Sequence, residues 1–352
     1  RPDPDEILHR GGTGVNILAF ESSCDETAVA VVRDGRQVLS DAILSQADMH
    51  ALYGGVVPEI ASRKHVQAIA ALTDKALSDA GLTKKDIDAV AVTYAPGLIG
   101  AVLVGVSFAK SAAYALGVPL IPVHHVRGHI AANYLAFPEL EPPFTALAIS
   151  GGNTLIVDVA DYTDMTVLGA TRDDAAGECF DKAARVLGLP YPGGKPMDEL
   201  AQQSQGGKYV LPSAHVSGAE LDMSFSGLKT AVVNLAHNAQ QKGEPLDASA
   251  LARDFARAVS GELVPRAMRA LELTGRTVLV AAGGVAANSV IRADLQAACD
   301  KAGVKLYLPP LKWCGDNGAM IGAQGYYEYL AGHTAGTTLN AYATMDLGDP
   351  VY

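Results

Sequence analysis

The chain has 352 residues, of which 49% are apolar, enough to bury the cores of two lobes without disulfide bonds. Its formal net charge of −11 excludes nucleic-acid binding through the overall field, so any contact with RNA requires a local basic patch or a partner chain. The four cysteines are scattered and form no Cys-x-x-Cys pair, which excludes a zinc ribbon and favours reduced thiols.

The N-terminal residues 1–14, RPDPDEILHRGGTG, lack the apolar core of a signal peptide, and we expect a flexible extension there. The longest apolar stretch runs from Ala95 to Val123, but Lys110 and several Gly and Pro residues interrupt it. We therefore expect a buried helix and a strand rather than a membrane span, and no membrane partner.

Two stretches share a pattern of strand, small-residue turn and strand. In residues 15–35, VNILAF precedes the turn ESSCDET, and Asp34-Gly35 closes a hairpin. In residues 144–162, FTALAI precedes SGGNT and a second apolar strand. The repetition predicts an internal duplication, with two similar lobes packed around a cleft.

Between these stretches, helical and strand patterns alternate. Residues 65–81 predict a helix whose buried face includes Val66, Ile69 and Thr73, with Gly81 after its end. A strand at 86–97, a helix at 98–117 and a strand at 118–123 follow.

Later in the chain, a helix is expected at 254–275, interrupted or kinked near Pro265. A strand and the turn AAGGVAAN precede another helix at 288–303. Strands that alternate with helices predict an α/β fold with a largely central sheet.

Gly-rich turns recur after the predicted strands, in ESSCDET, ISGGNT, PGG at 192–194 and AAGGVAAN at 281–288. Backbone amides in such turns can approach a phosphate with no side chain in the way. A single Gly-Gly turn is common in proteins that bind no phosphate, but the repetition of such turns in two lobes favours a nucleotide bound in the cleft. None of the turns matches a Walker loop or a G-x-G-x-x-G pattern, which disfavours a P-loop NTPase and a Rossmann dehydrogenase.

His125 and His129, in PVHHVRGHI, stand four residues apart and share a face if the segment is helical. Surface or capping histidines are the alternative, since this spacing arises easily by chance. A zinc protease needs Glu directly after the first His, where this chain has Val126, so that activity is excluded.

A metal site needs a further ligand, and Asp316 in WCGDNGAMIG is the candidate, on a Gly-flanked turn before a predicted helix. The alternative is that Asp316 only caps this helix. Two imidazoles and one carboxylate leave coordination positions open and suit Fe(II), with Zn(II) as the alternative.

Nine motifs spread over residues 15 to 345 closely resemble, in order, the tRNA N6-adenosine threonylcarbamoyltransferase family, formerly labelled O-sialoglycoprotein endopeptidase. The motifs are ESSCDET, YGGVVPEIASRKH, PGLIGAVLVG, PVHHVRGHI, ISGGNT, DDAAGECFDKAARVLGLPYPGG, FSGLKT, AAGGVAAN and DNGAM. The resemblance implies the two-lobed actin/Hsp70/sugar-kinase fold, with an N-terminal lobe at 15–130 and a nucleotide-binding lobe at 131–317. Residues 318–352 are expected to pack back onto the N-terminal lobe.

The family transfers a threonylcarbamoyl group from threonylcarbamoyl-AMP to the N6 amine of the adenosine 3′ of the anticodon, in tRNAs that read ANN codons. By motif match, His125, His129 and Asp316 would hold one divalent metal per chain, with Fe(II) favoured over Zn(II) or Mg(II). Asp25 and Glu26 fall on the acidic pair that faces the reaction centre. The implied substrate-binding residues are Ala148, Ile149, Ser150, Gly151, Gly152, Asn153, Asp181, Gly194, Asp198 and Asn288.

Local sequence leaves other roles open for three of these acids. Asp25 could instead cap the turn that contains it. Asp181 and Asp198 would, from local sequence alone, be ordinary acids on helix surfaces. In the implied reaction, Glu26 or Asp25 could accept the proton of the attacking amine, and for Asp25 this role and the capping role are equal alternatives.

The chain departs from the family pattern at three positions. Arg127 stands between the two histidines, where the family often has an acid. Asn153 replaces a His that most members carry, and an amide cannot titrate. Lys195 replaces a usual Pro. None of these departures removes a proposed metal ligand.

The resemblance also implies partners: a tRNA, an inactive paralogue that forms a heterodimer with the chain, and a small ATPase, all in the cytoplasm. Local basic residues could face the RNA, although solvated surface charge is an equal alternative for each; they are Arg63, Lys64, Arg172, Lys182 and Arg185. Two other functions stay open, an ATP-dependent phosphotransferase or ATPase of the same superfamily and an idle paralogue that acts as a scaffold. Neither needs the two histidines and Asp316.

Overall fold

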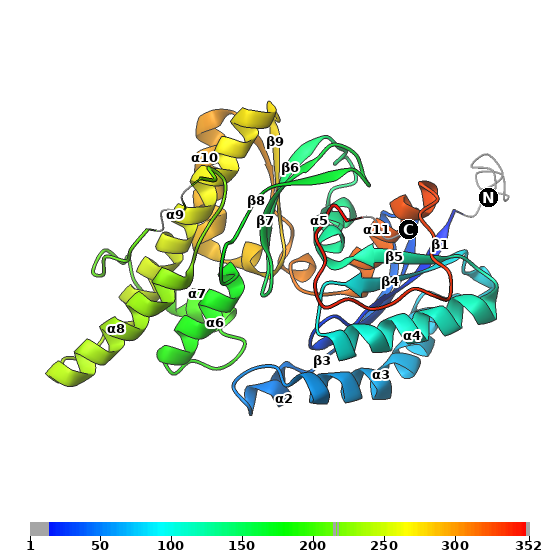
Figure 1. The fold of residues 1–352 in the computed structure, drawn as a ribbon, viewed down its shortest axis with the longest axis horizontal. Coiled ribbons are helices and arrows are strands. Elements are labelled where there is room, and N and C mark those ends of the chain that lie inside the picture. Colours follow the sequence, from blue (N-terminus) through cyan, green and yellow to red (C-terminus); the bar gives the residue numbers. More distant parts are fainter. Residues whose placement is uncertain (1–13, 214–215, 217, 350–352) are drawn as a thin grey trace.

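The computed structural model describes residues 14–213, 216 and 218–349 (Figure 1). Apart from Gly14, the predicted N-terminal extension lies outside the described residues. Two five-stranded sheets form the framework, with strand orders β3-β2-β1-β4-β5 and β10-β9-β6-β7-β8. The strands are β1 (Asn16–Glu21), β2 (Glu26–Arg33), β3 (Gln37–Ser45), β4 (Ala89–Ala95), β5 (Leu120–His124), β6 (Phe144–Ile149), β7 (Thr154–Val159), β8 (Met165–Ala170), β9 (Val278–Ala282) and β10 (Lys305–Tyr307).

The two sheets share one topology, which confirms the predicted internal duplication. In the first sheet, β1, β2 and β3 are antiparallel neighbours, while β4 and β5 continue parallel to β1. In the second sheet, β6, β7 and β8 are antiparallel, while β9 and β10 continue parallel to β6. Each lobe therefore begins with a meander and continues through crossover connections that contain helices.

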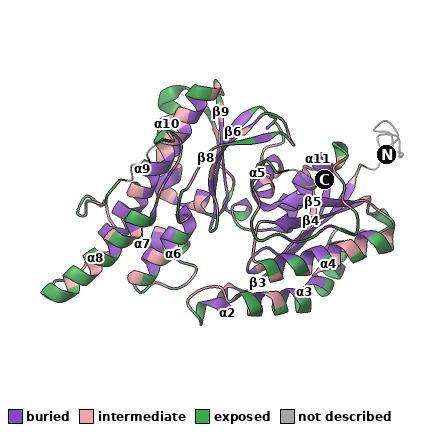
Figure 2. Ribbon diagram, in the orientation of Figure 1, coloured by how far each residue is buried: buried purple, intermediate pink, exposed green. Residues whose placement is uncertain are grey.

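The helices form three layers around the two sheets (Figures 1 and 2). They are α2 (Ala47–Ala51), α3 (Pro58–Asp79), α4 (Ile99–Leu116), α5 (His125–Ala136), α6 (Ala176–Val186), α7 (Gly194–Ala201), α8 (Ser226–Lys242), α9 (Ala248–Thr274), α10 (Ser289–Ala302) and α11 (Gly318–Leu330), with short 3-10 turns at Lys84–Asp86, Gly284–Ala287 and Leu311–Trp313. The helices α3 and α4 pack on the outer face of the first sheet, and α6 to α10 cover the outer face of the second. The helices α5 and α11 lie between the sheets and contribute to the buried clusters on both sides.

Glycines in α11 allow its close approach to the first sheet. A Cβ atom at Gly322 would lie 2.6 Å from a methyl carbon of Val32, and one at Gly325 would lie 2.6 Å from Cβ of Ala91. Such distances leave no room for a side chain. The predicted boundary between residues 130 and 131 falls inside α5, and the division into lobes at that point stays a prediction.

The helix predicted over 65–81 begins earlier, at Pro58, and its buried face also differs from the predicted one. Ile69 and Thr73 are buried as expected, but Val66 is 62% exposed, so its predicted place in the core is wrong. His65 occupies the inward position instead. The helix α9 continues through Pro265 as one helix, so the predicted interruption is not found, while the alternative of a kink stays a prediction.

One helix among the described residues, α4, is long and apolar enough to cross a membrane by length and composition alone. In the fold, Val102, Val106 and Ala109 of α4 pack against the first sheet. The ammonium group of Lys110 donates a hydrogen bond to the carbonyl of Leu339 at 2.9 Å. These contacts are those of a helix at the edge of a protein core. All four cysteines are free thiols.

Candidate active site

The two histidines of the predicted pair lie on the first turns of α5, which follows β5 directly. Nδ1 of His124 accepts a hydrogen bond from the backbone N–H of Val126 at 3.2 Å and caps the helix. His125 and His129 therefore lie one turn apart on the same face, with ring centroids 4.6 Å apart. Both side chains are buried.

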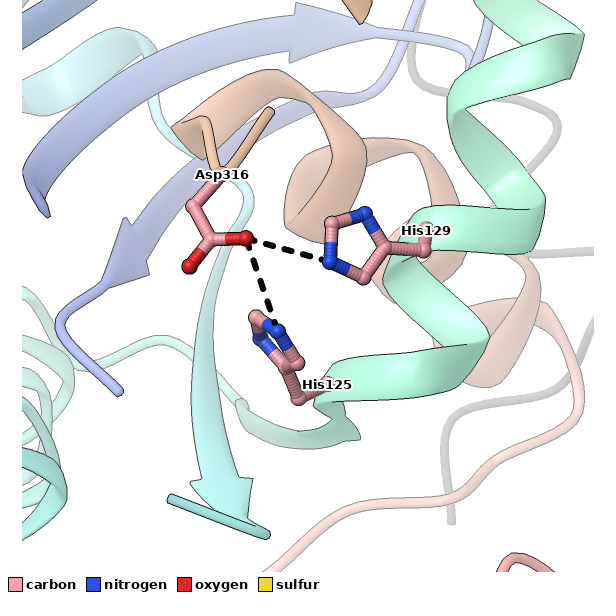
Figure 3. A group of neighbouring side chains, drawn as sticks. All are labelled: His125, His129 and Asp316. Atoms are coloured by element: carbon pink, nitrogen blue, oxygen red, sulfur yellow. Dashed lines mark ion pairs between the residues drawn. The ribbon is translucent and has the colours of Figure 1, made fainter. Parts of the chain in front are cut away.

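Asp316 reaches this pair from the loop that precedes α11 (Figure 3). Its Oδ1 atom lies 3.1 Å from Nε2 of His129 and 3.6 Å from Nε2 of His125. The neighbouring Asn317, and not Asp316, caps α11, because its side-chain oxygen accepts from the N–H of Met320 at 2.8 Å. The carboxylate of Asp316 is thus left to face the two imidazoles.

The donor atoms of His125, His129 and Asp316 lie within 4.8 Å of one another, close enough to share one metal ion. Both ring nitrogens of His129 are buried; Nε2 faces Asp316, whereas Nδ1 makes no hydrogen bond to any described residue. Burial opposes ionisation of Asp316, but the two imidazoles outweigh it and lower its pKa to about 2. Two buried imidazoles that turn their Nε2 atoms toward one ionised carboxylate fit a cation site with open positions.

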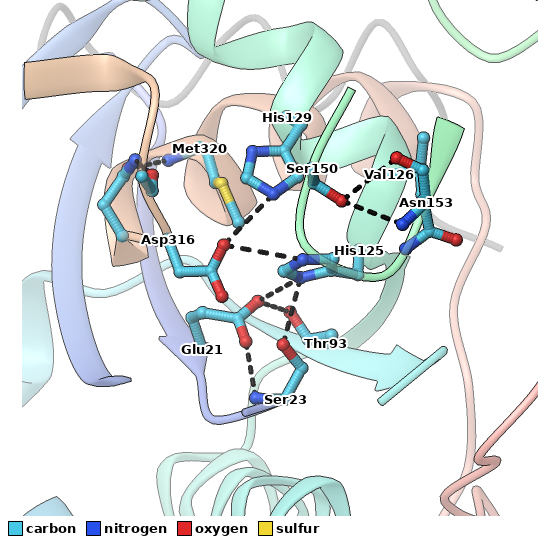
Figure 4. Close-up of polar contacts among 12 residues, drawn as sticks. Glu21, Ser23, Thr93, His125, Val126, His129, Ser150, Asn153, Asp316 and Met320 are labelled. Carbon is cyan, nitrogen blue, oxygen red and sulfur yellow. Dashed lines mark hydrogen bonds and ion pairs between the residues drawn. The ribbon is translucent and has the colours of Figure 1, made fainter. Parts of the chain in front are cut away.

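Glu21, at the end of β1, lies behind His125 (Figure 4). Its Oε2 atom is 3.0 Å from Nδ1 of His125, so Nδ1 carries the proton and Nε2 turns toward Asp316. Glu21 also accepts from the backbone N–H of Ser23 and from the hydroxyl of Thr93, each at 2.5 Å. Burial would raise the pKa of Glu21, but His125 and the hydrogen bond from Ser23 lower it.

Burial by itself would lower the pKa of His125. The carboxylates of Glu21 and Asp316 outweigh burial and raise this pKa to about 9. A carboxylate behind a metal-binding imidazole is the usual arrangement for fixing its tautomer and orientation. Sequence reasoning did not single out Glu21. The available signal was a single carboxylate that directly follows the apolar residues ILAF and precedes the turn SSCDE.

The acidic pair lies where the first hairpin turns: Asp25 is in the turn between β1 and β2, and Glu26 is the first residue of β2. His65 supports this turn, since its Nε2 lies 2.8 Å from the carbonyl oxygen of Cys24. No described backbone N–H donates to the Asp25 carboxylate, so the turn-capping alternative has no contact in its favour. Burial and the charges of Asp316 and Asp25 raise the pKa of Glu26 to about 9.

The loop at residues 150–153 approaches the same place from β6 of the second sheet (Figure 4). The backbone N–H of Ser150 donates to the carbonyl of Asn153 at 2.8 Å, and the N–H of Asn153 donates to the hydroxyl of Ser150 at 3.2 Å. A Cβ atom added at Gly151 or Gly152 would meet no described heavy atom within 4 Å. The loop therefore presents two open backbone positions of the kind that a phosphate requires.

Of the remaining predicted substrate-binding residues, Ala148 and Ile149 end strand β6, and the others lie in helices or directly before one. Asp181 in α6 accepts from the N–H of Gly193 at 2.7 Å, directly before Gly194. Burial raises the pKa of Asp181, and the charge of Asp25 in the other lobe adds to this effect. These contacts place Asp181 close to the start of α7 and to the acidic pair.

Asp198 accepts from the N–H and the hydroxyl of Ser289 at 2.9 and 2.7 Å, which joins α7 to α10. Asn288 caps α10 by accepting from the N–H groups of Val290 and Ile291, both at 3.1 Å. Asp198 is therefore not a free acid on a helix surface. The preceding turn is tight, because a Cβ at Gly283 (φ +90°) would lie 2.4 Å from the carbonyl oxygen of Ile149.

Of the three departures from the family pattern, Arg127 makes the most contacts. Its guanidinium donates to the carbonyls of Thr163 and Leu347 and lies 3.3 Å from the carboxylate of Glu328. The amide side chain of Asn153 makes no hydrogen bond to a described residue. Lys195 is exposed and lies 3.8 Å from Glu199, a weak surface pair.

The basic residues proposed as RNA contacts divide into two groups. Lys182 pairs with Asp174 and Glu178, Arg172 pairs with Asp222, and Arg185 donates to the carbonyl of Gly54. Arg63 and Lys64 on α3 are exposed and form no ion pair with a described residue. Their role in RNA binding stays a prediction.

Comparison with known proteins assigns the family. The family described as tRNA N6-adenosine threonylcarbamoyltransferase matches residues 37–323. Proteins of that name from Moorella thermoacetica and Clostridium botulinum strain Kyoto are 50% and 47% identical over 335 residues, each match covering 95% of this chain and 98% of the relative. One from Clostridium perfringens is 48% identical over 333 residues, again covering 95% of this chain and 98% of the relative.

Solved structures support the fold alone, because their sequence identities are low. HypF from T. kodakarensis aligns with a TM-score of 0.62 at 14% identity, covering 92% of this chain and 49% of that one. Component A of (R)-2-hydroxyglutaryl-CoA dehydratase from Acidaminococcus fermentans aligns with a TM-score of 0.53 at 15% identity, covering 90% of this chain and 99% of that one. The two-lobed actin/Hsp70/sugar-kinase fold expected from the motifs is thereby confirmed. The chain belongs to the tRNA N6-adenosine threonylcarbamoyltransferase family.

Proposed function

We propose that the chain is an acyltransferase that moves the threonylcarbamoyl group from threonylcarbamoyl-AMP to the N6 amine of the adenosine 3′ of the anticodon, in tRNAs reading ANN codons. The observation that carries this proposal is the convergence of His125, His129 and Asp316 with the open Ser150–Asn153 loop. The first group is a cation site, and the second is a phosphate cradle from the other lobe. An adenylate that carries an activated acyl group needs both.

The reaction joins the N6 nitrogen to the carbamoyl carbon and breaks the bond from that carbon to a phosphate oxygen of AMP. The backbone amides of Gly151 and Gly152 are the groups that would hold the phosphate as it leaves with the bonding electron pair. An aryl amine is a weak nucleophile, so the positioning of the two substrates supplies a large part of the rate. The proton lost by the amine needs a nearby base.

Asp25 is our candidate for this base. Burial and the neighbouring charges of Asp316 and Asp25 keep Glu26 protonated at neutral pH, with a pKa of about 9. A protonated Glu26 cannot accept a further proton, which leaves the carboxylate of Asp25 as the candidate. Exchange of the proton with solvent would follow after AMP leaves.

One divalent metal per chain would be held by His125, His129 and Asp316, with Fe(II) favoured over Zn(II) and Mg(II) because two imidazoles and one carboxylate leave coordination positions open. When bound, a Lewis-acid cation stabilises negative charge that develops on donor oxygens. Glu21 orients His125 for this purpose. For the adenosine part of the donor, we propose Asp181, Gly194, Asp198 and Asn288.

Protein partners are part of the proposal: an inactive paralogue that forms a heterodimer, a small ATPase, and the tRNA itself, in the cytoplasm. A partner chain has an apolar surface available on α3 and α4. Between these helices lies a groove of about 390 Å³ lined by apolar residues that include Leu77 and Phe108. Val66, Ile99 and Leu103 are exposed on the same helices.

The alternative is an ATP-dependent phosphotransferase or ATPase of the same superfamily. Such an enzyme would hold Mg²⁺ mainly through carboxylates and transfer phosphate to a hydroxyl or to water. The two buried imidazoles beside Asp316 have no role in that chemistry. A scaffold without activity would have no need of them either.

The test measures metal content and tRNA modification in one preparation. The purified chain, supplied with its companion proteins, receives threonylcarbamoyl-AMP and unmodified tRNA, and mass spectrometry follows the modified nucleoside. His125→Ala should lower both bound metal and modification, whereas His237→Ala, at an exposed histidine of α8, should lower neither. Full modification by His125→Ala after chelation would refute the proposal.

A further inference from the structure

Away from the active site, the side chain of Arg36 extends from the first lobe and contacts the second. Arg36 lies in the hairpin between β2 and β3 and projects among three tyrosine rings. Its guanidinium carbon is 4.8 Å from the ring centre of Tyr134, 5.7 Å from that of Tyr327 and 5.8 Å from that of Tyr162. These distances lie within the range of cation–π attraction.

The same guanidinium makes three hydrogen bonds toward the second lobe. It donates to the hydroxyl of Tyr162 at 2.9 Å, to the carbonyl of Leu140 at 2.9 Å and to that of Phe137 at 3.3 Å. Phe137 and Leu140 lie in the connection from α5 to β6, and Tyr162 lies in the turn from β7 to β8. One side chain of the first lobe therefore contacts two segments of the second.

The turn between β7 and β8 is held by further contacts from the central helices. The Tyr162 ring stacks on that of Tyr327 in α11, with centroids 3.8 Å apart and planes 4° apart. Gln324 of α11 donates to the carbonyl of Tyr162 at 2.9 Å. Arg127 of α5 donates to the carbonyl of Thr163 at 2.8 Å, and this contact gives a role to one departure from the family pattern.

Strand direction relates this contact to the active site. The hairpin of Arg36 joins the end of β2 opposite Glu26, and the turn of Tyr162 joins the end of β7 opposite the Ser150–Asn153 loop. The two lobes are thus fastened at the strand ends remote from the site. A change at the fastened ends would alter the angle between the sheets, and hence the separation of the loops at their other ends.

We propose that Arg36 is a positioning residue that sets the cation site of α5 and α11 in register with the phosphate loop of the second lobe. This inference rests on the proposed function, which divides the reaction between these two half-sites. All three metal-binding candidates lie on α5 and the loop before α11, and all the adenosine-binding candidates lie in the second lobe. Loss of Arg36 should therefore spare each half-site and impair only the step that needs both.

The test compares Arg36→Met and Arg36→Lys with Lys305→Met. The control removes a cation that lies 4.6 Å over the ring of Tyr307 but within one sheet. Bound metal and AMP affinity should stay at the wild-type values in all three variants. The rate constant of transfer at saturating substrates should fall about tenfold or more in Arg36→Met, since small misplacements of reacting groups are costly. Lys305→Met should keep the wild-type rate.

A second readout does not depend on activity. Spin labels are introduced as unnatural amino acids at the exposed Tyr114 of α4 and Lys301 of α10, in the outer layers of the two lobes. The distance distribution between the labels should broaden in Arg36→Met and in Tyr162→Leu, and it should be unchanged in Lys305→Met. If Arg36→Met does not fold, Tyr162→Leu and Arg36→Lys take its place under the same criteria.

Two results would overturn the inference. One is an unchanged label distance together with an unchanged transfer rate in Arg36→Met. The other is an equal loss of metal binding, AMP binding and transfer, which would mean that Arg36 only supports the fold. A wild-type chain that performs no transfer counts against the proposed function, while the label distances still decide whether Arg36 fastens the lobes.

Discussion

The substitution Glu21→Gln tests the arrangement behind His125 most directly. The two carboxylate oxygens of Glu21 accept from three donors: the N–H of Ser23, the hydroxyl of Thr93 and Nδ1 of His125. Glutamine offers one acceptor oxygen and one NH₂ group in the same volume. Since Glu21 is 1% exposed, its NH₂ group would meet a donor with no water to separate them.

The expected magnitudes follow from these contacts. Loss of one charge-assisted hydrogen bond and a buried donor–donor contact should lower the free energy of unfolding by about 2–3 kcal/mol. Loss of the carboxylate behind the imidazole should weaken metal binding by about 10- to 100-fold. The metal dissociation constant, measured by competition with a chelator on the folded protein, separates the second effect from the first.

Thr93→Val serves as the matched control. It removes one donor to the same Glu21 oxygen and leaves the contact between Glu21 and His125 in place. It should cost about 1 kcal/mol of stability, and metal affinity should remain that of the wild type. If Glu21→Gln binds metal as tightly as Thr93→Val, Glu21 does not orient His125 and the reasoning fails.

Three further outcomes are expected. Gly152→Val should abolish AMP binding in calorimetry with little change in Tm, because a Cβ at Gly152 meets no described atom within 4 Å; undiminished binding would exclude this loop as the phosphate site. Added metal should raise the Tm of the wild type and not that of His129→Ala, as ligand linkage requires, and an equal shift in both would remove His129 from the ligand set. Burial raises the pKa of Asp41 from 3.8 to about 6. Between pH 3.8 and pH 6, Asp41 is therefore protonated in the folded chain and ionised in the unfolded chain, so the stability of the wild type falls as the pH rises through this range. The stability gain of Asp41→Asn, which can still accept from the N–H of Gly318, should therefore grow from near zero at pH 4 to about 3 kcal/mol above pH 6, and a gain independent of pH would contradict this.

Much of the fold was predictable because its signals are local. Apolar strands that end in small-residue turns predicted β1, β2, β6 and β7, and their repetition predicted the duplicated topology. The helix over 65–81 shows where local pattern fails. In the structure His65 lies inward and Val66 outward, because packing against the first sheet decides which face of the helix is buried.

In the candidate site, too, some features were predictable from local sequence and others were not. The spacing of His125 and His129 suffices to place both imidazoles on one face, because that face is fixed by helix geometry alone. The motif order then suggested Asp316 as the third donor. The contact from Glu21 to His125 has no local signature, because the pairing of β1 with β4 and the packing of α5 bring these residues together.

By itself, the sequence determined the elements, their duplication and the residue types of the site, since each of these follows from periodicity or from motifs along the chain. Only the tertiary structure decided that Asp316 faces the imidazoles while Asn317 caps α11, that Glu21 lies behind His125, and that Arg36 joins the two lobes. The physical reason is that contacts between remote segments depend on sheet register and helix packing. Both are set by the fold as a whole and not by any one segment.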